Sequence, residues 1–145
     1  ITTLEDKSCG CVQKGGSAPI MDVIDYGEPV TTKGLNMLYG PGNDLVSATA
    51  LTAAGAHMVL FSTGRGTPFG APAPTLKIAT NSQLAAKKKT WIDFNAGVVA
   101  DGERTLDEAG ADLYRLVLDV ASGKQTCAEK KGFREISIFK DGVVL

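Results

Sequence analysis

Short apolar runs, separated by stretches rich in Gly, Pro and polar residues, set the pattern of this chain. Four of these runs, at 35–39, 58–61, 76–80 and 91–94, have the length and the composition of strands. The first two have the character of buried strands. The pattern therefore predicts four strands, each followed by Gly, Asn or Ser within a few residues.

Helical signals lie between and after these runs. Residues 45–54 are small and apolar over most of their surface and stop at Gly55, so we expect a helix packed closely against a sheet. A shorter helix is expected over 82–86. The clearest helix begins at a capping box, carries one apolar stripe and ends at Gly123. The expected N-caps are Asn43 or Asp44, Asn81 or Ser82, and Thr105 with Glu108.

The remaining segments carry weaker signals. Residues 1–17 have no apolar period, so we expect a loop with a short turn at 3–6. The run 19–24 is too short to separate helix from strand, and helix is favoured. Residues 133–140 alternate apolar and polar positions, which predicts a strand at the surface or at a subunit contact. The lysines at 87–89 suit the end of the preceding helix, so we interpret them as a solvated cap and not as a binding patch.

The order strand, helix, strand, loop, strand, helix, strand, helix is that of an α/β protein. We predict a mostly parallel, open, Rossmann-like sheet of about four to five strands with helices packed on it. The 145 residues suffice for one ordinary domain with its own core, and the hydrophobic fraction of 43% is that of a soluble globular protein. No apolar run approaches the length of a membrane span, and no signal peptide is expected.

Charge and cysteine content narrow the function classes. The formal net charge is −1, with 15 basic and 16 acidic residues, which gives no reason to expect a nucleic acid or an anionic membrane as partner. The three cysteines are an odd number, which favours a reducing, cytoplasmic setting over a disulfide framework. Cys9 and Cys11 are expected to be free thiols; alternatively, one lies in an active site or ligates a metal. The chain begins at Ile1 without Met, so we expect a processed chain or part of a longer protein.

The stretch with the most evident chemistry is the Gly- and Pro-rich connection at 62–74. Connections of this length inside a compact domain are uncommon and usually functional. Arg65 stands between two glycines, which let backbone N–H groups turn toward a ligand, and its guanidinium fits a carboxylate or phosphate. We therefore predict an anion site at the end of a strand. The alternative is an irregular surface loop with a solvated Arg; a dinucleotide fingerprint is excluded, because Phe69 stands where its third glycine would be.

Motifs along the whole chain carry a resemblance to a known family. They include Gly10-Cys-Val-Gln-Lys-Gly-Gly, Pro41-Gly-Asn-Asp, the specific block Phe61-Ser-Thr-Gly-Arg-Gly-Thr-Pro, Lys77-Ile-Ala-Thr-Asn-Ser and Trp91-Ile-Asp-Phe-Asn-Ala-Gly. On these motifs the chain resembles the C-terminal part of the altronate/galactarate dehydratase family of sugar-acid lyases. Galactarate dehydratases and sulfolactate sulfo-lyases resemble it as well. The resemblance implies that residues 1–145 form a single C-terminal α/β domain of a longer multidomain enzyme, whose upstream domains are absent here.

The resemblance also implies a reaction, which is the dehydration of D-altronate to 2-dehydro-3-deoxy-D-gluconate. A base must take the proton next to the carboxylate while cations or donors stabilise the aci-carboxylate that forms. An acid or a metal then helps the neighbouring hydroxide to leave. The family implies a divalent metal, Fe²⁺ or else Mn²⁺ or another ion, which we expect to be held mainly by the upstream domains. The expected partners are the sugar acid, the upstream domains and other copies of the enzyme, and we expect the isolated domain to be inactive.

Candidate site residues follow from combining this chemistry with the sequence. Arg65, with the backbone and hydroxyls around it, is the candidate carboxylate clamp. Lys7 and Lys14 are candidates for a second anion contact, or for the base if one of them is desolvated. His57 is the other catalytic candidate, although a single His at the start of a buried strand is more often structural. The substrate-binding candidates are Thr63, Gly64, Arg65, Gly66, Thr67, Asn81, Asp93 and Asn95.

A metal site is only weakly indicated. Cys11 and His57 are the only soft metal-ligand candidates, and two ligands are too few. Two other classes of function stay open: a module that binds a small acid without chemistry, and a structural or oligomerisation domain. Metal-dependent dehydration by the full-length protein would distinguish an enzyme from a binding module. For a structural domain, Arg65→Ala would hardly change turnover.

Overall fold

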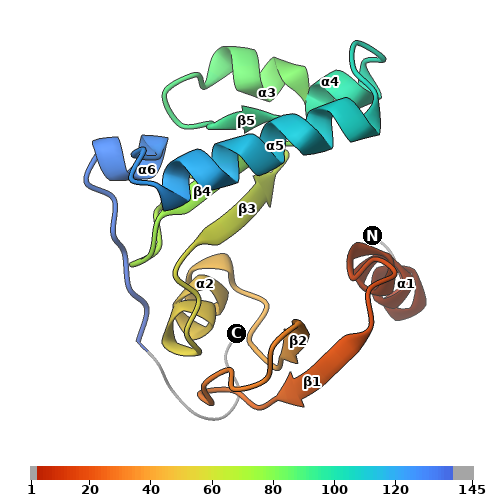
Figure 1. Cartoon of the computed structure of the whole chain (residues 1–145), viewed down its shortest axis with the longest axis vertical. Helices are drawn as coiled ribbons and strands as arrows, with labels where there is room; N and C mark the ends of the chain where they lie inside the picture. Colours follow the sequence, from red (N-terminus) through yellow and green to blue (C-terminus); the bar gives the residue numbers. More distant parts are fainter. Residues whose placement is uncertain (1–2, 139–145) are drawn as a thin grey trace.

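The computed structural model describes residues 3–138, with the side chain of Lys7 left out of the description. Helices lie between and after pairs of strands along the chain, which confirms the predicted α/β class (Figure 1). The strands are β1 (Ile20–Ile24), β2 (Leu35–Leu38), β3 (Val59–Thr63), β4 (Thr75–Ala79) and β5 (Phe94–Asn95). The helices are α1 (Leu4–Lys14), α2 (Asp44–Ala53), α3 (Ser82–Lys87), α4 (Gly97–Ala100), α5 (Leu106–Ala121) and α6 (Cys127–Lys130).

Within residues 3–138 all three strand pairings are parallel, as predicted, but the five strands form two sheets instead of one. β1 pairs with β2, and β3, β4 and β5 pair in that order. Figure 1 shows α2 between the two sheets and α5 beside the three-stranded sheet. The carboxyl ends of β3, β4 and β5 meet at one edge, which is where open parallel sheets usually bind ligands.

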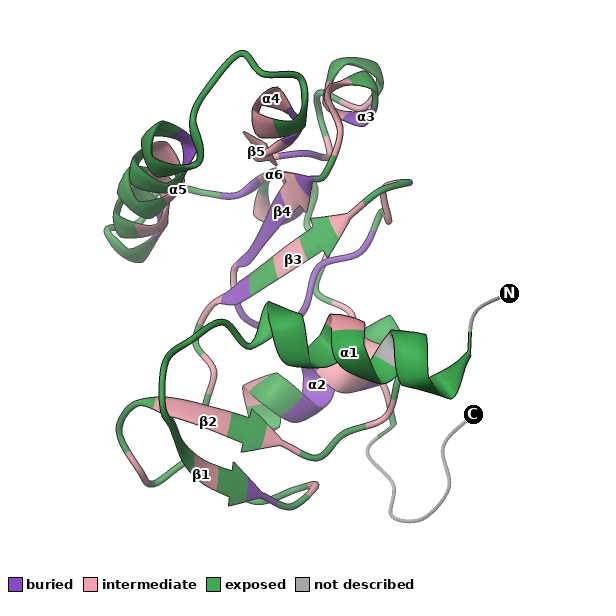
Figure 2. Cartoon of the chain, turned by 90° about the vertical axis from the view of Figure 1, so that its right-hand side faces the viewer, coloured by how far each residue is buried: buried purple, intermediate pink, exposed green. Residues whose placement is uncertain are grey.

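The central strand β4 is the best buried part of the larger sheet (Figure 2). Leu76 is fully buried and Lys77 is 1% exposed, as expected for a parallel strand covered on both faces. Phe69, from the loop between β3 and β4, packs edge-on against Phe61 with ring centroids 5.2 Å apart. The loop is thus anchored in the core, in a buried cluster of Ala48, Val59, Phe69 and Ala71.

The starts of α2, α3 and α5 agree with the caps expected from the sequence. Asn43 and Asn81 accept hydrogen bonds from backbone N–H groups in the first turns of α2 and α3. Thr105 and Glu108 form the predicted capping box of α5. Among the described helices, none has both the length and the apolar character needed to cross a membrane.

Two expectations near the N-terminus are wrong. The segment expected to be a loop contains α1, and the turn expected at 3–6 is its capping box, in which Thr3 and Asp6 each bond the other's backbone N–H. The segment 19–24, expected to be a helix, contains β1, because its backbone pairs with β2. A short apolar run alone does not reveal a pairing partner further along the chain.

Three differences occur toward the C-terminus. The strand expected at 91–94 is reduced to β5, because Trp91 N–H and Ile92 N–H both donate to the Lys88 carbonyl in a turn. The strand expected at 133–140 is not formed over 133–138, and residues 139–140 lie outside the described residues. The sequence did not predict the short helices α4 and α6.

Candidate functional site

The loop after β3 begins with a turn that fixes the backbone on both sides of Arg65. Gly66 N–H donates to Thr63 Oγ1 at 2.9 Å, and Gly66 has a φ of +84°, which L side chains rarely adopt. Asn81 Nδ2 donates to the Gly64 carbonyl at 3.1 Å. The guanidinium of Arg65 is therefore carried by a braced turn and not by a freely moving loop.

The amide of Asn81 connects this turn to the next helix. Its Oδ1 accepts the Leu84 N–H at 2.8 Å and caps α3, while its Nδ2 holds Gly64. A Cβ at Gly66 would lie 3.0 Å from Lys88 Cδ, so the loop packs directly against the end of α3. One side chain thus sets the distance between the Arg65 turn and α3.

A buried lysine braces the other side of the turn. Lys77 is 1% exposed, and its Nζ donates to the Thr67 carbonyl at 2.6 Å. Burial lowers the pKa of the Lys77 ammonium, and the charges of Asp93 and Glu135 oppose that shift. Lys77 therefore ties the loop to the central strand through a polar contact inside the core.

Three positively charged side chains gather where the loop meets α3. A shallow pocket of about 310 Å³ lies there, lined by Gly64, Arg65, Asn81, Gln83, Leu84, Lys87 and Lys88. No carboxylate lines it, and no ion pair joins Arg65, Lys87 or Lys88 to another described residue. Lys88 Nζ lies 4.4 Å from the centre of the Trp91 ring, which places its charge over the aromatic face. The pocket has the positive potential and the hydrogen-bond donors that an anion requires.

The carboxyl end of β5 is occupied by a polar network of its own. Asn95 Nδ2 donates to Ser82 Oγ at 2.9 Å, and Asn95 Oδ1 accepts the Gly97 N–H at 3.0 Å. Ser82 Oγ donates in turn to the Asp101 carboxylate. These bonds join α3 to α4 behind the sheet edge, and Asn95 does not line the pocket.

Asp93 lies away from the Arg65 pocket. It precedes β5, and its two carboxylate oxygens accept the backbone N–H groups of Lys77 at 2.8 Å and Cys127 at 2.7 Å. Burial raises the pKa of the Cys127 thiol, and the Asp93 charge adds to that shift. The structure therefore brings Asp93 together with β4 and α6, and not with Arg65 or Asn81.

The candidate bases and the metal-ligand candidates are spread over the fold. Lys7 and Lys14 lie on α1; the side chain of Lys7 is outside the described part, and Lys14 is exposed in the last turn. Cys11 is exposed on the same helix. His57 is exposed before β3, with Nδ1 3.3 Å from the Gly55 carbonyl oxygen. Lys14, Cys11 and His57 are absent from the lining of the Arg65 pocket.

The described residues do not fit the divalent metal that the resemblance implies. Within 3–138, no three His, Cys, Asp or Glu side chains come together as a ligand set. Cys11 lies on α1 and His57 lies before β3, and no carboxylate joins them in a cluster. We derive no catalytic step through a metal from these residues.

The sequence interpretation missed three lysines of this region. Lys87 does end α3, as expected for a cap, but Lys87 and Lys88 also line the pocket beside Arg65. A run of lysines after a helix is fully explained by the helix dipole, so nothing local marked them as site residues. Lys77 lies in an apolar strand pattern, and only its burial reveals its contact with Thr67.

Comparison with known proteins places these features in a family. The family profile described as "D-galactarate/Altronate dehydratase, C-terminal" matches residues 1–144. The chain belongs to the D-galactarate/altronate dehydratase family. The Arg65 loop therefore lies in the C-terminal region of this family, and the expected family membership is confirmed.

Individual family members show the extent of the similarity. The chain is 57% identical over 145 residues to the altronate dehydratase of Escherichia coli (strain K12) and 51% identical to that of Bacillus subtilis (strain 168), covering 100% of this chain and 29% of each relative. It is 36% identical over 147 residues to the galactarate dehydratase (L-threo-forming) of E. coli (strain K12), covering 99% of this chain and 28% of that relative. The chain thus spans less than a third of the length of these relatives.

Proposed function

We propose that this chain is the C-terminal domain of a sugar-acid hydro-lyase that converts D-altronate to 2-dehydro-3-deoxy-D-gluconate, and that its Arg65 pocket binds the substrate carboxylate. The observation that carries the proposal is the grouping of Arg65, on its braced turn, with Lys87 and Lys88 at the end of α3, with no carboxylate in the lining. The similarity to two altronate dehydratases favours altronate over galactarate or a sulfolactate.

In the proposed reaction, a base removes the proton from the carbon next to the carboxylate. The electrons of that C–H bond move toward the carboxylate and form an aci-carboxylate with one more negative charge. The neighbouring C–O bond then breaks while an acid donates a proton to the departing hydroxyl, which leaves as water, and the enol that remains tautomerises to the 2-keto acid. Cations that already hold the carboxylate stabilise the added charge without reorganising, because the Arg65 turn is fixed by Asn81 and Lys77.

We propose that the base and the metal come from outside this pocket. We propose that Lys7 or Lys14 on α1, or a residue of the upstream region, acts as base, and that the upstream region holds the divalent metal. Thr63 and Thr67 are proposed to add hydroxyl contacts beside Arg65. We also propose a cytoplasmic location, because the described cysteines are free thiols, as is usual in a reducing compartment.

The test is turnover of D-altronate, galactarate and sulfolactate by the full-length protein, detected through the 2-keto product. Arg65→Ala should lower kcat/KM for D-altronate by about 10- to 150-fold, the effect of losing charge-assisted hydrogen bonds of about 1.5–3 kcal/mol. Arg65→Lys should recover part of this loss, because it keeps the charge but not the planar fork. Lys88→Ala should lower kcat/KM by about 10-fold.

Two matched variants control for the loss of a positive charge. Arg115→Ala removes an exposed guanidinium paired with Asp112 on α5, and Lys89→Ala removes an exposed neighbour of Lys88 that does not line the pocket. Both should leave kcat/KM within about twofold, the usual effect of an exposed charge. Equal effects of Arg65→Ala and Arg115→Ala would contradict the pocket assignment, and absence of turnover with all three acids would favour the binding module.

A further inference from the structure

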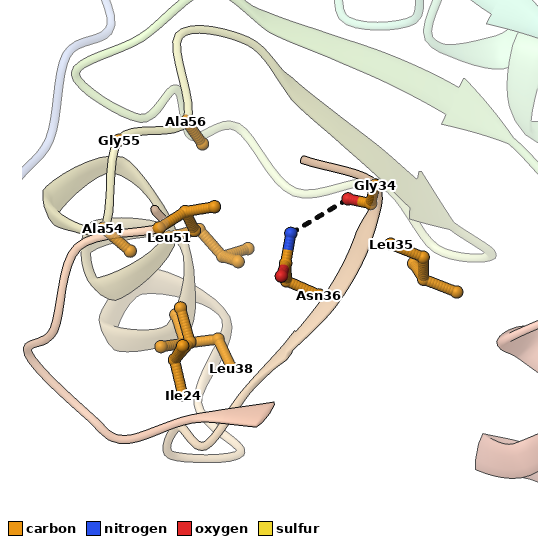
Figure 3. A pocket seen from close by; sticks show the side chains of 10 residues that line it. Ile24, Gly34, Leu35, Asn36, Leu38, Leu51, Ala54, Gly55 and Ala56 are labelled. Atoms are coloured by element: carbon orange, nitrogen blue, oxygen red, sulfur yellow. Dashed lines mark hydrogen bonds between the residues drawn. The ribbon is translucent and has the colours of Figure 1, made fainter. Parts of the chain in front are cut away.

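The two-stranded sheet presents two different faces. Ile24 and Leu38 pair with each other, and Asn36 lies two residues before Leu38 on β2, so all three side chains point to the same side. They line an apolar pocket of about 350 Å³ that α2 closes with Leu51 and Ala54 (Figure 3). This inner face is therefore packed toward the rest of the domain.

The outer face of the same sheet is apolar and uncovered. Val23 and Met37 pair on this side and are 72% and 44% exposed, and Tyr39 extends the row at 73% exposed. We call these three residues the open face. Parallel sheets are almost always covered on both faces, and a two-stranded sheet is marginal by itself. An uncovered apolar face on a parallel pair therefore indicates a missing neighbour.

Helix α1 also has apolar side chains that no other element of residues 3–138 covers. It is capped by Thr3 and has Lys14 in its last turn, but apart from the half-buried Gly10 each of its described side chains is exposed. Leu4 and Val12 are 82% and 78% exposed. Helices of this length are marginal in water and owe their stability in proteins to packing of one face. Figure 1 shows α1 standing apart from both sheets, joined to the domain through the start of β1.

We propose that α1 and the open face together form the docking surface for the preceding part of the same polypeptide in the full-length enzyme. The relatives are more than three times as long as this chain, and the matching family region is C-terminal, so most of their length precedes it. That preceding chain joins at residue 1, three residues before α1 begins. A segment tethered there meets this surface at an effective concentration in the millimolar range, which a second copy of the chain does not reach.

The proposal has a consequence for the candidate catalytic groups. Lys14 and Cys11 lie on α1 and do not reach the Arg65 pocket within this domain. If α1 is covered by the upstream region, these side chains lie at the boundary between the two parts of the enzyme. This inference rests on the proposed place of the chain in a longer enzyme, but not on the role of Arg65.

Hydrogen exchange on the unmodified full-length protein is the first test. Backbone amides of α1 and β1 should exchange at least about 100-fold more slowly than expected for a helix and a strand edge open to solvent. Exchange of α1 within seconds would overturn the proposal. The measurement needs neither substrate nor turnover, so an inactive protein with protected α1 would count only against the proposed function.

Thiol labelling tests the open face separately. In the full-length protein, Val23→Cys should react with a maleimide at least about 100-fold more slowly than Ser122→Cys, an exposed control after α5, with labelled sites located by peptide mass spectrometry. In denaturant both should react at similar rates. Equal rates under native conditions would overturn the proposal. So would protection that disappears when the protein is diluted to monomers, because a second copy would then be the occupant.

Discussion

At the scale of single residues, Lys77 combines a charge with complete burial. It is the largest fully buried side chain of residues 3–138. Its ammonium donates a hydrogen bond to the Thr67 carbonyl, and its Nζ lies 6.0 Å from the centre of the Phe133 ring. Asp93 and Glu135 favour its charged form, but desolvation outweighs them and lowers its pKa. A buried ammonium with one carbonyl partner carries a cost that the neutral amine does not.

This environment gives Lys77 a defined effect on stability at alkaline pH. Between its lowered pKa and the ordinary value of 10.5, the folded chain releases a proton that the unfolded chain keeps. The free energy of unfolding of the wild type should therefore rise with pH in that window relative to Lys77→Met. Urea unfolding followed by Trp91 fluorescence measures it, with the exposed Lys89→Met as control for loss of one charge. A difference between wild type and Lys77→Met that stays constant up to pH 10 would contradict this account.

At the scale of elements, the position of α3 depends on two contacts at its start. Asn81 ties its start to the Arg65 turn, and Gly97 at the start of α4 lies against the same region. A Cβ at Gly97 would be 2.3 Å from the Ser82 backbone nitrogen. The closeness of α3 and α4 therefore requires glycine for space and not for an unusual φ.

Two glycine substitutions should act in opposite directions. Gly97→Ala should lower the free energy of unfolding by about 1–3 kcal/mol, the usual cost of overpacking, because backbone atoms of α3 must move. Gly110→Ala, in the exposed middle of α5 with nothing within 4 Å of the added Cβ, should raise it by about 0.5–1 kcal/mol. Urea unfolding of both variants checks the pair. If Gly97→Ala leaves the free energy of unfolding unchanged, α3 and α4 can move apart without loss of stability.

Whether a helix or strand could be predicted from the sequence depended on whether its signals are local. Helices with a strong cap and a packed face, such as those begun by Asn43 and Thr105, were predicted because both signals are local. Helix α1 was missed because its sequence has no apolar stripe, although Thr3 and Asp6 form a capping box at its start. β1 was missed because the pairing that makes it a strand lies with β2. The Arg65 turn was predicted from its glycines, but the lysines beside it are brought there only by tertiary structure.

At the scale of the whole molecule, residues 3–138 form a positively charged pocket but no assembled set of catalytic groups. The exposed His57 and Lys14 do not line the pocket, and the described residues form no metal-ligand cluster. The 145-residue chain by itself should therefore give no 2-keto product from D-altronate. Product analysis checks this, with circular dichroism to show that the helices are formed. Turnover by the chain alone would mean that the base lies within this domain.

The strand pairings also bear on how the chain acquires its structure. Parallel strands generally require long crossovers, yet every paired position here lies only fourteen to sixteen residues from its partner, as with Val23 and Met37 or Ile78 and Phe94. Closing such short loops costs little entropy, and rates of folding rise as contacts become more local. Each pairing can form before distant parts of the chain meet. The domain should therefore fold rapidly for a parallel α/β protein, with the β3–β4 unit and its Arg65 turn able to form early as one local structure.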